Sequence, residues 1–139
     1  MGLPIQNFDR GQISGGRIDL DRLSGPAIRA FLNLAEAWQL SIPEQMSLLG
    51  GVPRSTYMRW KAERDAKLSL DQLERVSHLL GIYKSLQVLL PSTANQWVRL
   101  PNAHPIFGGQ PALNLLLEGG ITALHRVRLH LDAQRGGWA

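Results

Sequence analysis

The sequence predicts an all-α protein, on the basis of its apolar periodicity, its capping signals and its glycine stops. Apolar residues recur at three- and four-residue steps, and no segment alternates apolar and polar residues long enough to predict a strand. Two serine-based capping boxes and several glycines divide the chain into helix-length pieces. The 139 residues contain no cysteine, which excludes disulfides and thiolate metal sites, and the core is expected to fold without crosslinks.

The first part of the chain combines scattered glycines with alternating charge, so we expect residues 1–24 to form a flexible arm. A first helix is expected at about 25–39, with Ser24 as its N-cap and Pro26 in its first turn. One face of this helix is apolar, which predicts the burial of Ile28, Phe31, Leu32, Leu34, Ala35 and Trp38.

Two short helices with a glycine turn between them are expected next. The capping box SIPE at residues 41–44 predicts a helix that ends at Gly50 and Gly51, and a third helix is expected from Pro53 to about Glu63. This arrangement is typical of a helix-turn-helix, which places its second helix in the major groove of DNA. We expect the small residue Ser47 where the two helices cross, and apolar contacts from Val52, Tyr57 and Trp60.

The third helix divides into two sides when its residues are placed at ~100° per residue. Tyr57 and Trp60 fall on one side, and the opposite side carries Arg54, Ser55, Met58, Arg59 and Ala62. Arginine forks can pair with guanine edges, and residues at the margins of such a face can reach phosphates. The predicted DNA-binding residues are therefore Arg54, Ser55, Thr56, Arg59 and Lys61. The alternative is a basic face that meets only solvent.

Charge placement supports DNA binding more than the total charge does. Fifteen Lys and Arg against eleven Asp and Glu leave a formal net charge of +4, which is a mild excess. Between residues 53 and 67, however, five basic residues accompany two acidic ones. Most of the excess therefore lies on and just after the third helix.

The rest of the chain predicts further helices. The capping box SLDQ at residues 69–72 predicts a helix that stops at Gly81, and residues 82–90 are expected to form a fifth helix that Pro91 closes. Beyond Pro91, prolines and glycine pairs break the chain into short pieces, with helices expected at 93–99, 111–118 and 121–134. We therefore expect one domain at 25–90 and a small helical domain at 91–139.

Four motifs carry a resemblance that covers nearly everything after Ser24: LLGGVPRSTYMRW, LSLDQLERVSHLLGIYKSL, WVRLPNAHPIFGGQPAL and LDAQRGGW. The sequence resembles the Xre-type antitoxins of RES-Xre toxin-antitoxin modules, also described as Xre/MbcA/ParS-like. The resemblance implies a Cro-like helix-turn-helix domain followed by a toxin-binding domain. It also implies a homodimer that neutralises a RES toxin, an NAD-degrading enzyme, and that represses its own promoter by binding operator DNA.

Two other functions remain open from the sequence. One is a stand-alone dimeric Cro-like repressor without a toxin partner, and the other is an interaction protein that has lost DNA binding. A salt-dependent complex with the upstream DNA would separate the second from the rest.

The C-terminal segment contains candidate partner contacts. Trp97 and Phe107 lie in a proline-stiffened loop, where they either contact a partner or fill the joint between short helices. On the last helix, an apolar stripe leaves the arginines on other faces. Together with the resemblance, this predicts toxin-binding residues Arg126, Arg128, Arg135 and Trp138. A solvated face is the alternative for the first two, and the second antitoxin chain is an alternative partner for the last two.

No motif for catalysis, a metal or a cofactor is found, so we expect a protein that is not an enzyme. The four histidines do not converge in sequence, and His125 and His130 lie five residues apart, about 140° round a helix. No apolar run is long enough to cross a bilayer, and the first residues lack the features of a secretion signal. We therefore expect a soluble cytoplasmic protein without a membrane partner.

Overall fold

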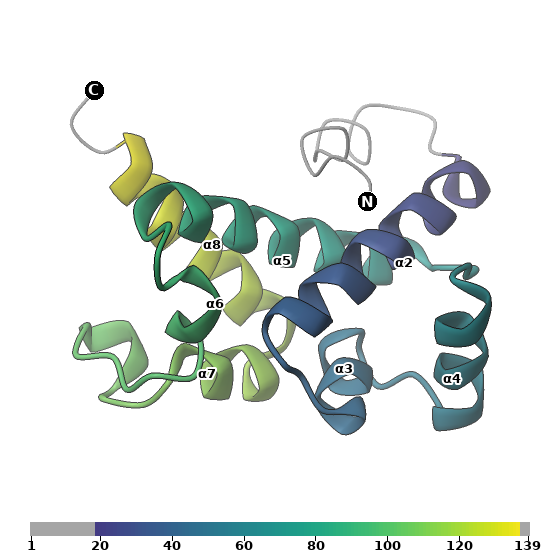
Figure 1. Cartoon of the computed structure of the whole chain (residues 1–139), viewed down its shortest axis with the longest axis horizontal. Coiled ribbons are helices and arrows are strands. Elements are labelled where there is room, and N and C mark those ends of the chain that lie inside the picture. The colour runs from purple at the N-terminus through teal and green to yellow at the C-terminus, as the bar shows by residue number, and fades with distance from the viewer. Residues whose placement is uncertain (1–18, 137–139) are drawn as a thin grey trace. The chain divides into compact units, whose positions relative to one another are not determined.

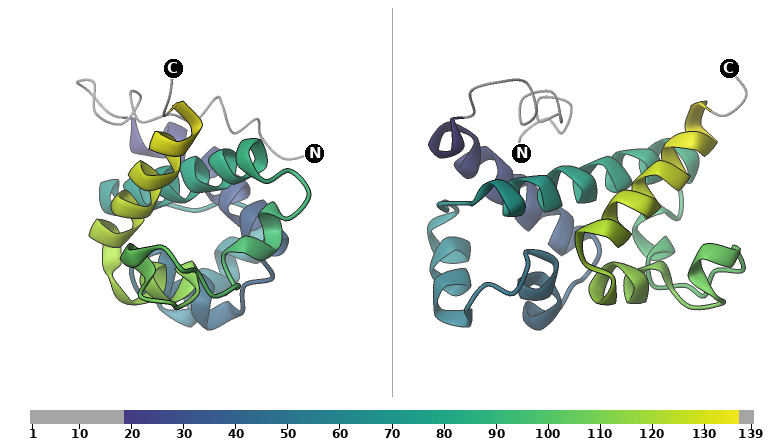
Figure 2. Two further views of the ribbon diagram at one scale, coloured as in Figure 1. Left: turned by 90° about the vertical axis from the view of Figure 1, so that its left-hand side faces the viewer. Right: turned by 180° about the vertical axis from the view of Figure 1, so that it is seen from behind.

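A computed structural model describes residues 19–136, and the regular elements in that range are helices, apart from one isolated bridge between Pro101 and Pro111. The all-α prediction is therefore confirmed (Figure 1, Figure 2). The chain divides into two compact units, Met1–Leu80 and Gly81–Ala139. The elements in chain order are α2 (Leu20–Ala37), α3 (Ile42–Leu48), α4 (Arg54–Glu63), α5 (Leu70–Leu89), α6 (Ala94–Trp97), the 3-10 helix η2 (Pro105–Phe107), α7 (Ala112–Glu118) and α8 (Gly120–Gly136).

The helix α2 starts earlier than the sequence predicts. Asp19 is its N-cap, because the Asp19 side chain accepts a hydrogen bond from the backbone N–H of Arg22 at 3.0 Å. Residues 20–24 are therefore helical and not part of an arm, whereas residues 1–18 of the predicted arm lie outside the described residues. Pro26 accordingly lies inside the helix and not in its first turn.

Ser24 is a buried link within the first unit and not an N-cap. Its hydroxyl donates to the carbonyl of Leu20 at 2.6 Å and accepts from the backbone N–H of Leu68 at 2.9 Å. A serine hydroxyl can cap a helix or bond back to the preceding turn, and both use the same local sequence. The contact with Leu68 supports the second arrangement.

The apolar face predicted for α2 is confirmed. All six of its residues are buried, with at most 7% of their surface exposed: Ile28, Phe31, Leu32, Leu34, Ala35 and Trp38. The first half of α5 contributes Leu73, Val76 and Leu80 to the buried residues of the same unit. Leu70, at the start of α5, is 42% exposed and stands apart from this core.

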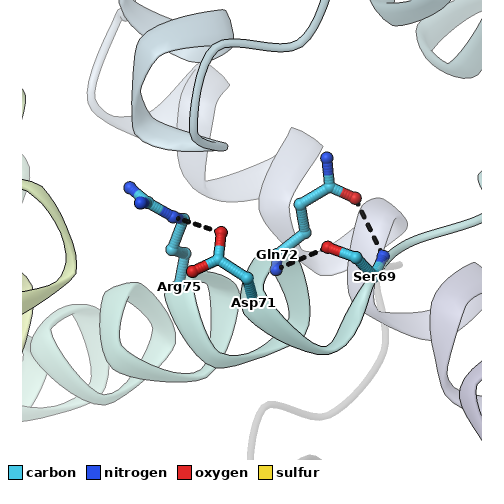
Figure 3. Close-up of polar contacts among 4 residues, drawn as sticks. All are labelled: Ser69, Asp71, Gln72 and Arg75. Carbon is cyan, nitrogen blue, oxygen red and sulfur yellow. Dashed lines mark hydrogen bonds and ion pairs between the residues drawn. The ribbon is translucent and has the colours of Figure 1, made fainter.

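Both predicted capping boxes are present. The N–H of Ser41 donates to Oε1 of Glu44 at 2.8 Å, and the N–H of Glu44 donates to Oγ of Ser41 at 3.2 Å. At the start of α5, the same reciprocal pair joins Ser69 and Gln72 at 2.9 and 3.1 Å (Figure 3). These bonds satisfy helix-end donors locally, which is why a four-residue pattern is sufficient to predict them.

Gly50 and Gly51 make the turn between α3 and α4. Both have a positive φ, 92° and 91°, in the region that favours glycine. The N–H of Gly50 donates to the carbonyl of Ser47 and that of Gly51 to the carbonyl of Met46, each at 2.9 Å, as in a Schellman motif. The predicted turn is confirmed, but Ser47 is exposed and does not lie at a buried helix crossing.

Gln45 is the buried side chain that joins α3 to α4. Its Nε2 donates to the carbonyl of Leu40 at 2.8 Å, and its Oε1 accepts from the hydroxyl of Tyr57. The Tyr57 side chain is fully buried, and its ring lies edge-on to Phe31 with 6.5 Å between centroids. Burial also raises the pKa of the Tyr57 hydroxyl, which keeps this donor protonated.

The helix α5 runs without a break from Leu70 to Leu89, so the predicted stop at Gly81 and the separate helix at 82–90 are wrong. Gly81 is instead a place of close approach. A Cβ there would overlap the side chain of Arg128, whose Cζ is 2.6 Å from that position. A glycine in a helical pattern serves either as a stop or as a gap for a neighbour, and only the neighbour distinguishes them.

The second unit confirms the predicted helices after Pro91 with altered ends. The helix α6 is shorter than the expected 93–99, α7 agrees with 111–118, and α8 extends beyond 121–134 at both ends. In the loop between α6 and α7, Phe107 is buried and its ring lies edge-on to the half-buried Trp97, with 5.6 Å between centroids. These two rings therefore pack on each other. The buried stripe of α8 consists of Ala123, Leu124, Val127 and Leu131.

Replacing Tyr57 by Phe is expected to destabilise the first unit. The substitution keeps the ring but leaves Oε1 of Gln45 buried without its donor, a defect that costs about 1–3 kcal/mol. Urea unfolding of the full chain measures the change. The control is Met58→Leu, at the next and exposed position of α4, for which we expect a change within about 0.5 kcal/mol. Equal stability of Tyr57→Phe and the wild type would contradict the role given to this bond.

Candidate functional site

The helix α4 buries its rings and exposes its basic side chains, as the sequence predicts. Tyr57 and Trp60 are 0% and 6% exposed, and Val52 before the helix is also buried. Thr56 is half-buried. The exposed residues of the helix include Arg54, Ser55, Met58, Arg59, Lys61 and Ala62. The five predicted DNA-binding residues thus all lie on the short helix α4. That they contact DNA stays a prediction.

The N-terminal end of α4 lacks a side-chain cap. Pro53 is its N-cap and makes no capping hydrogen bond, and the first turn holds no acidic residue. By contrast, Asp19 and Ser41 cap α2 and α3. Backbone N–H groups of the first turn of a helix have no partner within the helix, and an uncapped first turn is suited to contact an anion. Arg54 is the first residue of α4, so its side chain lies next to first-turn backbone N–H groups that can donate to a phosphate.

Arg59 lies among acidic residues. It lines a hollow of about 460 Å³ together with Asp21, Trp60, Glu63, Asp65, Ala66 and Lys67. Three of these neighbours are carboxylates, which attract a guanidinium in competition with a phosphate. Arg54 is not among the lining residues. Arg54 and Arg59 are thus expected to contribute unequally to the affinity for DNA.

The predicted partner-binding residues of the C-terminal segment differ in exposure. On α8, Arg126 is exposed, whereas Arg128 is half-buried beside Gly81 and has its Nε 3.6 Å from Oδ2 of Asp132. Arg135 is exposed at the end of the same helix. Trp138 lies outside the described residues. The structure therefore brings Arg128 and Arg135 to one hollow, which Arg126 does not line.

Two histidines that the sequence did not connect lie together in the second unit. The ring centroids of His104 and His130 are 4.2 Å apart, and Phe107 lies edge-on to both. With Trp97 and other residues they line a hollow of about 360 Å³. Desolvation by burial lowers the pKa of His130, and the charge of His104 lowers it further. No local signal reveals this pair, because it joins a loop to a helix.

Residues 19–136 contain neither a candidate metal centre nor a membrane span. That range holds no group of three or more His, Cys, Asp or Glu residues placed to bind a metal ion. Its helices include none with the length and apolar character needed to cross a bilayer.

Comparison with known families identifies both units. The model of the antitoxin Xre-like helix-turn-helix domain matches residues 19–81, and that of the antitoxin Xre/MbcA/ParS C-terminal toxin-binding domain matches residues 85–137. The chain belongs to the Xre-type antitoxin family. The antitoxin is also similar to the uncharacterized protein y4oB of Sinorhizobium fredii (strain NBRC 101917 / NGR234), with 40% identity over 128 residues, which are 90% of this chain and 97% of that protein.

The family assignment gives each surface of the antitoxin a class of partner. The first match contains α3, the glycine turn and α4, so α4 is the second helix of a DNA-binding motif. The second match contains Arg126, Arg128 and Arg135 within a toxin-binding domain, and it ends one residue before Trp138. The matched families are antitoxin and DNA-binding families, not families of enzymes.

The stability of the antitoxin is expected to fall in mild acid because of His130. Its lowered pKa means that the unfolded chain binds more protons than the folded one below the ordinary value of about 6.5. The stability that depends on neutral His130 is therefore complete above a pH of about 6.5 and is lost as the pH falls through the pKa of the folded state. Urea unfolding between about pH 7 and 5 should show a smaller decline for His130→Gln than for the wild type.

The control for this experiment is Ala133→Gln, at an exposed position of the same helix that carries no titratable side chain, and it should keep the wild-type pH dependence. If the free energy of unfolding declined by the same amount in His130→Gln and in the wild type, His130 would not be the cause of the decline.

Proposed function

We propose that the antitoxin neutralises a RES-domain toxin that degrades NAD and, as a homodimer, represses its own operon through α4. The observation that carries the proposal is the exposed guanidinium face of α4 opposite its buried rings, in a chain that also contains a toxin-binding domain. Operator binding places the antitoxin with the DNA, in the cytoplasm. A stand-alone repressor without a toxin is the competing proposal.

Operator contacts are assigned by position along α4. Recognition helices use their N-terminal residues to reach base edges, which favours Arg54 and Ser55 for readout. Lys61 and the half-buried Thr56 are assigned to phosphates, and Arg59 to the margin of the face. A homodimer would present two such helices, which requires half-sites about one helical turn, ~34 Å, apart.

Toxin binding is assigned to the C-terminal segment from about Pro91 onward, with Arg126, Arg128, Arg135 and Trp138 as contact residues. The support is the family match at 85–137 and the exposure of Arg126 and Arg135 on α8. An arginine of this segment can occupy the place of the substrate anion in the toxin where a carboxylate there accepts its planar fork. Such a contact would exclude the pyrophosphate of NAD from the toxin.

Substitution at the two ends of the α4 face should separate readout from phosphate contact. Arg54→Ala is expected to weaken the specific complex by about 1–3 kcal/mol and to relax the sequence preference. Lys61→Ala should weaken binding about equally on all sequences and reduce the salt slope by about 1. Gel shifts over a series of salt concentrations measure both effects. The matched control is Arg126→Ala, which removes the same charge from the toxin-binding domain.

DNA binding by Arg54→Ala that equals the wild type at every salt concentration would remove this residue from the readout. The absence of any specific complex with the upstream DNA for the wild type would overturn the repressor part of the proposal.

Titration of a RES toxin tests the other part. The wild-type antitoxin should co-purify with the toxin and stop its consumption of NAD. Arg126→Ala should need a higher antitoxin concentration for the same protection, by a factor of about ten if the lost hydrogen bonds are to a charged group. Arg54→Ala, altered only in the DNA-binding domain, should protect as the wild type does.

Full protection by both Arg126→Ala and Arg128→Ala would exclude these two residues from toxin neutralisation. Failure of the wild type to co-purify with the toxin would instead favour the stand-alone repressor.

A further inference from the structure

The second unit contains a basic hollow between the second half of α5 and the end of α8. Its volume is about 420 Å³, and it is lined by Gly81, Lys84, Arg128, Asp132, Arg135 and Gly136. Three of these side chains are cationic and one is anionic, so the basic hollow carries a formal charge of +2. Cations that converge on a concave surface raise the local concentration of anions.

Arg128 lies against the wall of the basic hollow, in space that is open because Gly81 has no side chain. The atom Cδ of Arg128 would be 2.9 Å from a Cβ at that position, and Cζ would be 2.6 Å away. Any other residue at position 81 would displace the guanidinium. Only 23% of the Arg128 side chain is exposed, so the fork has a restricted orientation.

The carboxylate in the basic hollow orients its neighbours. One oxygen of Asp132 lies 3.6 Å from Nε of Arg128, and the other accepts from the hydroxyl of Ser85 at 2.9 Å. The same hydroxyl, which is fully buried, accepts from Nη1 of Arg135 at 3.5 Å. One acidic group thus positions two arginines without neutralising both.

We propose that the basic hollow binds an oxyanion, either a carboxylate or a phosphate, through Lys84, Arg128 and Arg135. Guanidinium groups pair with either anion through two parallel hydrogen bonds, and a lysine adds a point charge. In the cell the oxyanion comes from an acidic side chain of the toxin or from a free phosphate compound. Only the first source rests on the proposed function.

Calorimetric titration of the full-length antitoxin with inorganic pyrophosphate tests the site without toxin or DNA. At constant ionic strength, the wild type should bind in a saturable manner, and Arg135→Gln should lose about tenfold in affinity or more. The matched control is Arg126→Gln, an exposed arginine of the same helix that does not line the basic hollow, and its affinity should change by less than about twofold.

Gly81→Ala provides a second variant that tests positioning. Alanine is favoured over glycine inside a helix by about 0.5–1 kcal/mol, so α5 should keep its helix while Arg128 is displaced. The expected result is weaker pyrophosphate binding at undiminished thermal stability. The proposal would be overturned if the wild type did not bind pyrophosphate in a saturable manner. It would also be overturned if Arg126→Gln and Arg135→Gln reduced the affinity equally.

The source of the oxyanion is identified by repeating toxin binding in pyrophosphate and in chloride at equal ionic strength. If an acidic side chain of the toxin occupies the basic hollow, pyrophosphate should weaken toxin binding by the wild type and not by Arg135→Gln. If toxin binding is the same in both salts, an acidic side chain of the toxin is excluded as the source, and the pyrophosphate titration alone carries the site. A toxin that never binds would refute the proposed function and leave the pyrophosphate result to decide the site.

Discussion

The buried hydrogen bonds from the carbonyl of Leu40 through Gln45 to Tyr57 determine how the two helices of the DNA-binding motif are joined. Each group is removed from water, so none can lose its partner without a penalty. This constraint places the ring of Tyr57 in the core beside Phe31. Because α4 is anchored by this side, its opposite side carries the exposed arginines. The buried contacts therefore decide which side of α4 faces solvent.

The two units hold their cations in different ways. On α4, Arg54 is exposed at an uncapped helix end, where it can follow the phosphates and base edges of a duplex. In the second unit, Asp132 and Ser85 orient Arg128 and Arg135 before any partner arrives. An oriented fork loses less side-chain entropy on binding and favours one anion geometry. The exposed arginine of α4 suits a long polyanion such as DNA, whereas the oriented arginines of the second unit suit a single anionic group.

Glycine illustrates why some parts of the fold could be predicted and others could not. Gly50 and Gly51 end α3 with positive φ and two bonds to the preceding turn, which are local properties. Gly81 follows an equally helical pattern, yet α5 continues through it, and the missing side chain leaves room for Arg128. The candidate DNA-binding face was predictable because it needs only the helical period. The basic hollow and the pair of His104 and His130 were not.

The sequence by itself determined the helical class, both capping boxes, the glycine turn and the division of α4 into a ring side and an arginine side. These features depend on partners within about five residues, so the local pattern contains all of their physics. The tertiary structure decided that α2 begins at Leu20, that Gln45 and not Ser47 is buried beside Tyr57, and that α5 is one helix. Each of these depends on a side chain brought close by folding, such as the bond between Ser24 and Leu68, and no local pattern contains that partner.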